Sequence, residues 1–524
     1  MTSQASRVLT PAYLLICALS LSIGWGIRGN FGHEAGAMMP GALTALAVTL
    51  LSGRKDWQAR AVYFAAFGAL GWSFGGSISY MRVIAYTHSG HSPSVIYGFA
   101  CLWVVGFLWA SVGGAGTALP AFLSRERLTE FAPPLATMWG VWIVRDVVEY
   151  RISNAPEFRH NDPLYWYDSD WTAALTAVAA MLLYCGVRRK MDKASTLILS
   201  MAIGWFGGML LLVVLMNLHM TPPRSDNWAG SVGMVVGMWV FLQKNGLSGV
   251  TYASIVTGFI GGIGFSGAAI LKLIEMKGGG DTNWHSVLEQ SYGAINGIAV
   301  AIAMAMIVRR APLVSEEAPG IKWADSFAYL FLLLSVLLFN MQKNPEEWVK
   351  QKALPEVMFH LPAIGWFSLL YFALTLGFLY LLTSNRKRPI ALFTIPALPK
   401  TQLLYLALLW IFVMMSFERA LVHFSAVRLV TEAVIFFNAV VVSALILTHS
   451  QEEEIVPIEP LTDYRSLNKR ATIYAIASLV ILSIAGYGIT HLLYGENTTD
   501  FKGKEFRFGT HATTTKAKKD APHP

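Results

Sequence analysis

Long apolar segments with few charges recur along the whole chain, and this feature most narrowly limits what the chain can fold into. A helix needs about 20 mostly apolar residues to cross a bilayer. Of the 524 residues, 54% are hydrophobic and only 14% are charged, whereas soluble domains usually carry about 25% charged residues. The composition therefore excludes a soluble protein and predicts an all-α, polytopic membrane helix bundle.

Charges, glycines and prolines bound fifteen apolar segments, each of which is expected to form a membrane-spanning helix. They cover residues 11–28, 33–52, 60–83, 95–117, 133–149, 171–187, 196–216, 228–243, 250–273, 288–308, 324–341, 363–383, 401–417, 427–448 and 471–493. Two segments match a membrane span less well than the others, since the fifth carries three charges and the eighth is short. Proline lacks an amide hydrogen, so Pro40 predicts an interruption in the second helix.

Basic clusters indicate the orientation of these segments. Arg188–Lys190, Arg309–Arg310 and Arg386–Arg388 all directly follow even-numbered segments. Cytoplasmic loops are enriched in lysine and arginine. We therefore predict a multi-pass protein of the cell (inner) membrane with its N-terminus in the cytoplasm and, after fifteen spans, its C-terminus outside.

Short motifs recur in the same order at offsets of 180, 191 and 195 residues. Ile23-Gly24-Trp25 returns as Ile203-Gly204-Trp205, the glycine-rich stretch 71–76 as 262–267, and Tyr97-Gly98 as Tyr292-Gly293. An even number of helices per repeat gives two halves of the same orientation, related by an axis along the membrane normal. The expected organisation is a first six-helix repeat (1–193), a second (194–390), three further helices (391–496) with an acidic cytoplasmic linker (449–470), and a disordered polar tail (497–524).

This parallel six-plus-six layout resembles the major facilitator transporters in architecture. Their cytoplasmic glycine-aspartate-arginine signature is missing from the loop Gly53–Arg60. The resemblance therefore concerns the layout alone, and no functional residue is assigned through it.

Ionisable residues within membrane segments mark the candidate site, because a charge near the bilayer centre costs at least about 2.5 kcal/mol. In the predicted topology these residues gather at odd-numbered turns, which places them on the outer face, where we expect a polar cavity. The candidates for substrate binding or proton handling are Arg28, His33, Glu34, Arg82, Arg145, Asp146, His219, Arg224, Asp226 and Lys272.

The first turn, residues 26–37, is the most informative of these segments. Its glycines allow close backbone approach, and Arg28 offers a planar fork of donors suited to an anionic or polyhydroxylated substrate. His33 beside Glu34 forms a titratable pair and is predicted to be the proton-sensitive element. Alternatively, the segment is a tight turn in which Arg28 and Glu34 pair with one another or with lipid headgroups.

The other candidates also have structural interpretations. Arg145 and Glu149 stand four residues apart and can pair along one helix, whereas Asp146 has no such local partner. Arg82 and Lys272 end matching helices and can extend to the lipid headgroups instead of a ligand.

Several site classes have no sequence support. The chain has no cysteine or histidine ligand spacing for a metal and no nucleotide-binding glycine motif, so we expect neither a metal nor a cofactor. Its net charge of +8 is assigned to membrane orientation and not to nucleic-acid binding. The expected partners are the lipid bilayer and a polar small-molecule or saccharide substrate.

Three functions fit these observations. The duplicated helices and the charges at equivalent turns favour a secondary transporter of a polar or anionic small molecule. The one-sided placement of the ionisable groups favours a membrane-embedded transferase or hydrolase that acts on an envelope saccharide or lipid-linked substrate. In the third alternative, a structural membrane subunit, the charges serve only assembly. Whether the protein is an enzyme, and which residues would then be catalytic, stays open at this stage.

Overall fold

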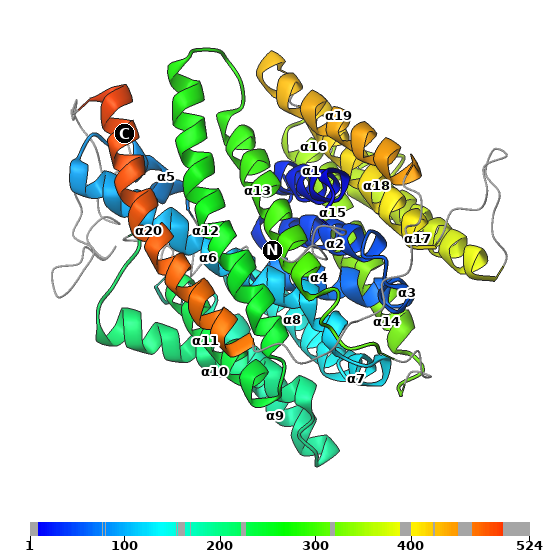
Figure 1. Cartoon of the computed structure of the whole chain (residues 1–524). Coiled ribbons are helices and arrows are strands. Elements are labelled where there is room, and N and C mark those ends of the chain that lie inside the picture. The colour runs from blue at the N-terminus through cyan, green and yellow to red at the C-terminus, as the bar shows by residue number, and fades with distance from the viewer. Residues whose placement is uncertain are drawn as a thin grey trace.

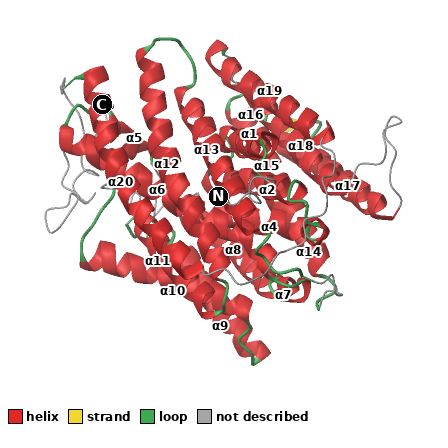
Figure 2. Ribbon diagram, viewed as in Figure 1, coloured by secondary structure: helices red, strands yellow, loops and turns green. Residues whose placement is uncertain are grey.

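A computed structural model describes residues 9–75, 77–78, 80–153, 155, 163–167, 169–221, 227–314, 320–387, 400–422, 425–448 and 464–495. The described chain is almost entirely helical (Figure 2). Its two strands, β1 (Val357–Met358) and β2 (Leu361–Pro362), pair in one short antiparallel hairpin. The prediction of an all-α bundle is confirmed.

The helices follow one another with short connections. The first part contains α1 (Pro11–Arg28), α2 (His33–Leu50), α3 (Lys55–Ala59), α4 (Ala61–Gly75), α5 (Met81–Thr87), α6 (Ser92–Phe122), α7 (Arg125–Thr129), α8 (Ala132–Ser153) and α9 (Trp171–Arg188). The middle part contains α10 (Lys193–Gly208), the π-helix η3 (Met209–Leu215), α11 (Asn227–Lys244), α12 (Ser248–Lys277) and α13 (Trp284–Ile307). The last part contains α14 (Ala324–Phe331), the π-helix η4 (Leu332–Leu338), α15 (Phe339–Met341), α16 (Lys343–Lys350), α17 (Ala363–Lys387), α18 (Lys400–Val422), α19 (Ala426–Thr448) and α20 (Tyr464–Tyr494).

Each of the fifteen predicted segments coincides with a helix or a run of helices. By length and composition, 11 of these are able to cross a membrane within the described chain. The helices α2 and α4 are apolar but shorter, and α8 and α11, the two weakest predicted spans, are not among the 11. The bundle is thus a membrane bundle, and the count of fifteen crossings stays a prediction.

Six helices form the centre of the bundle. The largest contact joins α6 to α12, and α1 packs against α13 while α2 and α4 pack on one another. Figure 1 shows α17, α18 and α19 together on one side and α20 on the other, where it packs along α12 and α6. The α6–α12 and α1–α13 contacts both join the predicted units 1–193 and 194–390.

Glycine explains why these helices approach so closely. A Cβ atom added to Gly233 of α11 would lie 1.9 Å from the carbonyl oxygen of Gly204 of α10. One added to Gly297 of α13 would lie 2.2 Å from the carbonyl oxygen of Cys17 of α1. Membrane helices associate mainly through such close packing, because lipid and apolar side chains compete equally for each surface.

Two details of the expected helices are wrong. The helix α2 continues through Pro40 without a break, and Gly24 of α1 gives the proline ring room to pack. The third segment is two helices, since α4 ends at Gly75 and α5 begins only at Met81, with Tyr80 buried between them.

The predicted linker 449–470 is also partly helical. The helix α20 begins at Tyr464, whose ring packs on Phe122 and Tyr252. The buried Tyr464 ring thus holds the polar start of α20 against the bundle. The charges in this segment did not predict that contact. The predicted tail 497–524 lies outside the described residues.

Candidate functional site

A buried ion pair joins the end of α1 to the start of α13. Arg28 Nη1 lies 2.9 Å from Glu289 Oε1, and the two side chains are only 2% and 4% exposed. The Tyr80 hydroxyl donates to the same Glu289 oxygen at 2.5 Å. Buried charges in membrane helices are costly and mark functional sites, so these residues define the candidate site.

Aromatic rings enclose the guanidinium of Arg28. Its central carbon lies 4.8 Å from the ring centroid of Trp25 and 5.2 Å from that of Trp109. Tyr80 and Phe265 complete the wall, with their ring centroids 4.9 Å apart. A desolvated cation over aromatic faces gains about 2 kcal/mol, so the cage holds Arg28 in place independently of its carboxylate partner.

His285 connects this pair to the surface. It lies one helical turn before Glu289, and its side chain is 38% exposed. Its Nε2 atom lies 3.6 Å from Glu289 Oε1 and 3.4 Å from the Tyr80 hydroxyl. We call Arg28, Tyr80, His285 and Glu289 the Arg28 site.

The glycine-rich first turn shapes the Arg28 site. Gly32 has a φ of +91°, a left-handed conformation that glycine adopts without strain. A Cβ atom on Gly29 would lie 2.8 Å from Glu289 Oε2, and one on Gly36 would lie 2.6 Å from the Arg28 carbonyl oxygen. The acidic residue that pairs with Arg28 is Glu289, and not Glu34, the partner considered from the sequence.

Glu34 belongs to a neighbouring surface group of charges. It is exposed at the start of α2, and it interacts electrostatically with Lys343 and Asp170. Lys343 Nζ donates to the Phe31 carbonyl. Asp170 Oδ2 accepts a hydrogen bond from Asn227 at 2.6 Å. Glu34, Asp170 and Lys343 lie far apart in the sequence. In the structure they lie close together, at the same end of the bundle as Arg28.

Asp170 gives this end a pH-dependent stability. Asp170 is exposed as a whole residue, but neighbouring atoms remove water from around its carboxyl group. This loss of water, followed by repulsion from Glu34, raises the pKa of Asp170 from 3.8 to about 6. The folded protein thus holds this proton more tightly than the unfolded chain does. The resulting stabilisation is complete below the unfolded pKa and is lost as the pH rises through about 6.

We therefore expect the melting temperature to fall more steeply between pH ~4 and ~7 in wild type than in Asp170→Asn. Asp281→Asn is the matched control. Both carboxylates belong to exposed residues, but Asp170 accepts from Asn227 and is repelled by Glu34, whereas Asp281 lies in the connection before α13. It should keep the wild-type pH dependence. Identical curves for wild type and Asp170→Asn would contradict the assignment.

Arg145 and its acidic neighbours lie on α8, where Arg145 and Glu149 also act electrostatically on Asp170. Arg145 Nε lies 3.5 Å from Glu149 Oε2, as their spacing predicted, and 3.0 Å from Asp146 Oδ1. The expectation that Asp146 has no local partner is wrong, because the long arginine side chain folds back to its immediate neighbour.

The remaining candidates have surroundings of their own. His219 is buried, its Nε2 lies 2.8 Å from Asn217 Oδ1, and its ring packs on Tyr167. Arg82 lies half-buried on α5. Lys272 lies near His88, where burial and then the lysine charge lower the histidine pKa.

Three candidates cannot be placed. The side chain of His33 and the whole of Arg224 and Asp226 lie outside the described residues. The predicted outward-facing polar cavity therefore stays a prediction; its expected lining is Arg28, His33, Glu34, Arg145, Asp146, Arg224 and Asp226.

Tyr80 and Glu289 were not predicted as site residues from the sequence, and His285 was not among the ten candidates. A signal for Glu289 was present, because it is a charge inside an apolar segment, one turn after a histidine. Tyr80 gave no signal, since it was expected to lie within a continuous third helix.

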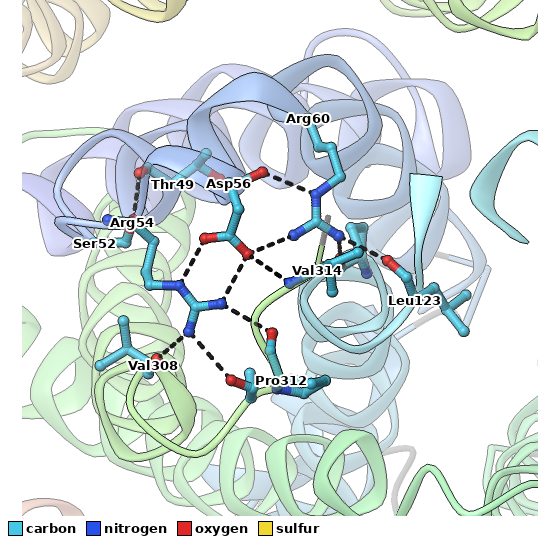
Figure 3. Close-up of polar contacts among 11 residues, drawn as sticks. Thr49, Ser52, Arg54, Asp56, Arg60, Leu123, Val308, Pro312 and Val314 are labelled. Atoms are coloured by element: carbon cyan, nitrogen blue, oxygen red, sulfur yellow. Dashed lines mark hydrogen bonds and ion pairs between the residues drawn. The ribbon is translucent and has the colours of Figure 1, made fainter. Parts of the chain in front are cut away.

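A second buried cluster lies at the opposite end of α13 (Figure 3). Asp56 accepts hydrogen bonds from Arg54 at 2.7 Å and from Arg60 at 3.0 Å. The side chains of the two arginines are 1% and 3% exposed, and that of Asp56 is 5% exposed. We call these three residues the arginine clamp.

The arginine clamp holds the ends of two helices. Arg54 donates to the carbonyls of Val308 and Pro312, just beyond α13, at 2.7 and 2.9 Å. Arg60 donates to the carbonyls of Pro120 and Leu123, at the end of α6, at 2.7 Å each. Guanidinium groups at helix C-termini satisfy carbonyls that have no partner in the helix and complement the helix dipole. The clamp is thus a sealed junction between α2, α6 and α13.

The apolar helices and the two buried charge clusters define the class as an α-helical integral membrane protein. Comparisons with models of protein families, with curated proteins and with solved structures find no match to this chain. Among the described residues there is no group of three or more histidine, cysteine, aspartate or glutamate side chains that could hold a metal ion.

Proposed function

We propose that the protein is a secondary transporter of a polar or anionic small molecule, built from the units 1–193 and 194–390 in the cell (inner) membrane. In the proposed orientation the Arg28 site faces outward, the arginine clamp faces the cytoplasm, and the C-terminus lies outside. The ligand is bound by Arg28, in line with the planar donor geometry of guanidinium groups.

One observation carries the proposal: arginines from the first unit hold α13 at both of its ends. Glu289 near the start of α13 pairs with Arg28, and the carbonyls beyond its end accept from Arg54. A carrier that exposes its site alternately needs one seal at each end of the same helices, and only one is released at a time. The Arg28 site reaches the surface through His285, whereas the clamp is closed, which suits a state that has access from one side.

The contact between α1 and α13 suits such a movement. Gly293 and Gly297 face the backbone of α1, with no side chains interlocked at these points. Smooth glycine surfaces let helices shift without first unpacking large side chains.

Uptake by the full chain in sealed vesicles tests the proposal. The probes are labelled inorganic phosphate, succinate and glucuronate, which cover phosphate and carboxylate chemistry. Arg28→Gln and Arg28→Lys should each reduce uptake roughly tenfold or more, because a charged hydrogen bond contributes about 1.5–3 kcal/mol and each 1.4 kcal/mol is tenfold. Lysine should not restore uptake, since it lacks the planar fork.

Arg151→Gln is the control, because Arg151 is an exposed arginine at the end of α8, and its uptake should equal that of wild type. Equal uptake by wild type and Arg28→Gln, or no uptake of any probe by wild type, would end the transport proposal.

A membrane-embedded transferase or hydrolase acting on an envelope saccharide or lipid-linked substrate is the second candidate. One observation favours it: Tyr80 and His285 both lie near a single carboxylate at a one-sided opening. Such a set can supply an acid and a base. Turnover of a labelled saccharide at the vesicle surface, without entry into the vesicle, would replace transport with this function.

A further inference from the structure

We propose that Glu289 is the proton-binding group of this carrier and that its protonation releases Arg28 from the ion pair, so that Arg28 binds an anion and one proton and one anion move together. This inference rests on the proposed transport function. It adds the coupling ion, the charge of the substrate and the residue that links them.

Charge balance in a sealed site is the first argument. Arg28 and Glu289 together are neutral, and both are almost completely buried. If Glu289 gains a proton, the site carries an unbalanced positive charge, which is costly in a membrane interior. A carboxylate or phosphate on Arg28 restores neutrality. The empty site and the site that holds both proton and anion are therefore the two low-energy states, and either ion alone is disfavoured.

The aromatic cage around Arg28 also supports the proposal, because it stabilises the arginine when its ion pair is lost. Trp25 and Trp109 lie within 5.2 Å of the Arg28 guanidinium carbon. They continue to stabilise the cation when Glu289 is neutral. Arg28 thus keeps its position and presents its donors to a ligand instead of following the carboxylate.

A path for the proton from the surface to Glu289 supports the proposal as well. His285 is the exposed member of the Arg28 site, and the Tyr80 hydroxyl lies between its Nε2 atom and Glu289 Oε1, at 3.4 and 2.5 Å. The hydroxyl proton of Tyr80 moves to Glu289, and the Tyr80 oxygen takes a proton from the His285 imidazolium. Tyr80 ends unchanged, His285 becomes neutral, and Glu289 becomes a carboxylic acid.

The surroundings contain few competing groups. Among the described residues, the titratable or charged groups in contact with Glu289 are Arg28 from α1, Tyr80 from the connection before α5, and His285 from α13 itself. Tyr292 of α13 also titrates, and it interacts electrostatically with Arg28. The helices α6 and α12 contribute Trp109 and Phe265, which do not titrate. The proton acceptor on this path is therefore Glu289.

Calorimetric titration of the purified full chain tests the coupling. Inorganic phosphate, succinate and glucuronate are each titrated in two buffers of different ionisation enthalpy, which gives the number of protons taken up per anion bound. Wild type should take up about one proton per anion. Glu289→Gln should bind the same anion with no proton uptake, and Arg28→Gln should not bind it.

Glu432→Gln is the matched control. Glu432 is a buried carboxylate on α19 that accepts from Ser416 at 2.8 Å, and its replacement should leave the proton count unchanged. Should Glu289→Gln fail to fold, Tyr80→Phe keeps the ion pair and removes the hydroxyl of the relay, together with the hydrogen bond that this hydroxyl accepts from Arg28 at 3.3 Å. It should then slow proton uptake in stopped-flow measurements without changing the count.

The outcomes separate this inference from the transport proposal. Uptake of an anion by wild-type vesicles, together with binding that takes up no proton, would overturn the coupling and leave transport standing. Binding of none of the three anions would overturn the anion assignment. An unchanged proton count in Glu289→Gln would show that another group carries the proton.

Discussion

Replacing Asp56 with asparagine should prevent accumulation of folded protein. The carboxylate of Asp56 is the common partner of Arg54 and Arg60, and all three side chains are sealed from solvent. Asparagine keeps an oxygen acceptor but removes the charge, which leaves two buried guanidinium groups uncompensated. Loss of one partner of a buried ion pair costs about 3–5 kcal/mol. That amount is a large share of the 5–15 kcal/mol that stabilises a typical folded protein.

The measurement is the yield of monodisperse protein after detergent extraction, followed by its thermal unfolding. Asp325→Asn is the matched control. Asp325 forms an ion pair with Arg125, which lies just after the end of α6. The side chains of Asp325 and Arg125 are 17% and 23% exposed. Because water reaches this pair, its loss should lower stability by no more than about 1 kcal/mol. Equal yields and melting temperatures for Asp56→Asn and wild type would refute the structural role of the clamp.

Replacing Gly297 with alanine should damage both stability and uptake. The added Cβ atom would lie 2.2 Å from the Cys17 carbonyl oxygen and 2.6 Å from the Ala18 Cα atom. Backbone atoms cannot move aside as a flexible side chain can, so α1 must shift away from α13. Overpacking of this kind costs about 1–3 kcal/mol. The shift also separates Arg28 from Glu289, so uptake should fall even in the fraction that folds.

Gly267→Ala is the control for this change. Gly267 lies within α12, and a Cβ atom added there meets nothing within 4 Å. Alanine is a better helix former than glycine by about 1 kcal/mol, so this variant should be as stable as wild type or more so. The two variants are compared by melting temperature and by uptake of the same labelled probes. Similar behaviour of both would mean that the α1–α13 contact is not as close as described.

The sequence allowed the helices to be located but not their pairing. The predicted segments 171–187 and 401–417 begin within one residue of α9 and α18, although α18 continues to Val422. Such agreement is expected, because hydropathy and charge depend only on nearby residues. Pro40 misled the prediction, since the local rule for proline takes no account of Gly24 on the neighbouring helix. The break at Tyr80 was missed for the same reason, because tertiary contacts bury that residue.

The candidate site was found in part. Arg28 and its glycine-rich turn stood out because an arginine between glycines is unusual at the end of an apolar helix. Its partner Glu289 lies 261 positions away, and nothing in either segment alone indicates that they meet. The arginine clamp was missed altogether, because most of its acceptors are main-chain carbonyls such as that of Val308, which every residue type carries.

The sequence by itself determined the class of the protein and the places where charge enters the bundle. Those properties follow from the transfer of each segment between water and lipid, which depends on local composition. Only the tertiary structure decided which charges neutralise one another. Arg28 meets Glu289, and Arg54 meets the end of α13, because glycines such as Gly297 let α1 and α13 touch along their backbones. That contact depends on the shapes of two distant segments together, and a charge inside the membrane takes the partner that such packing places within its reach.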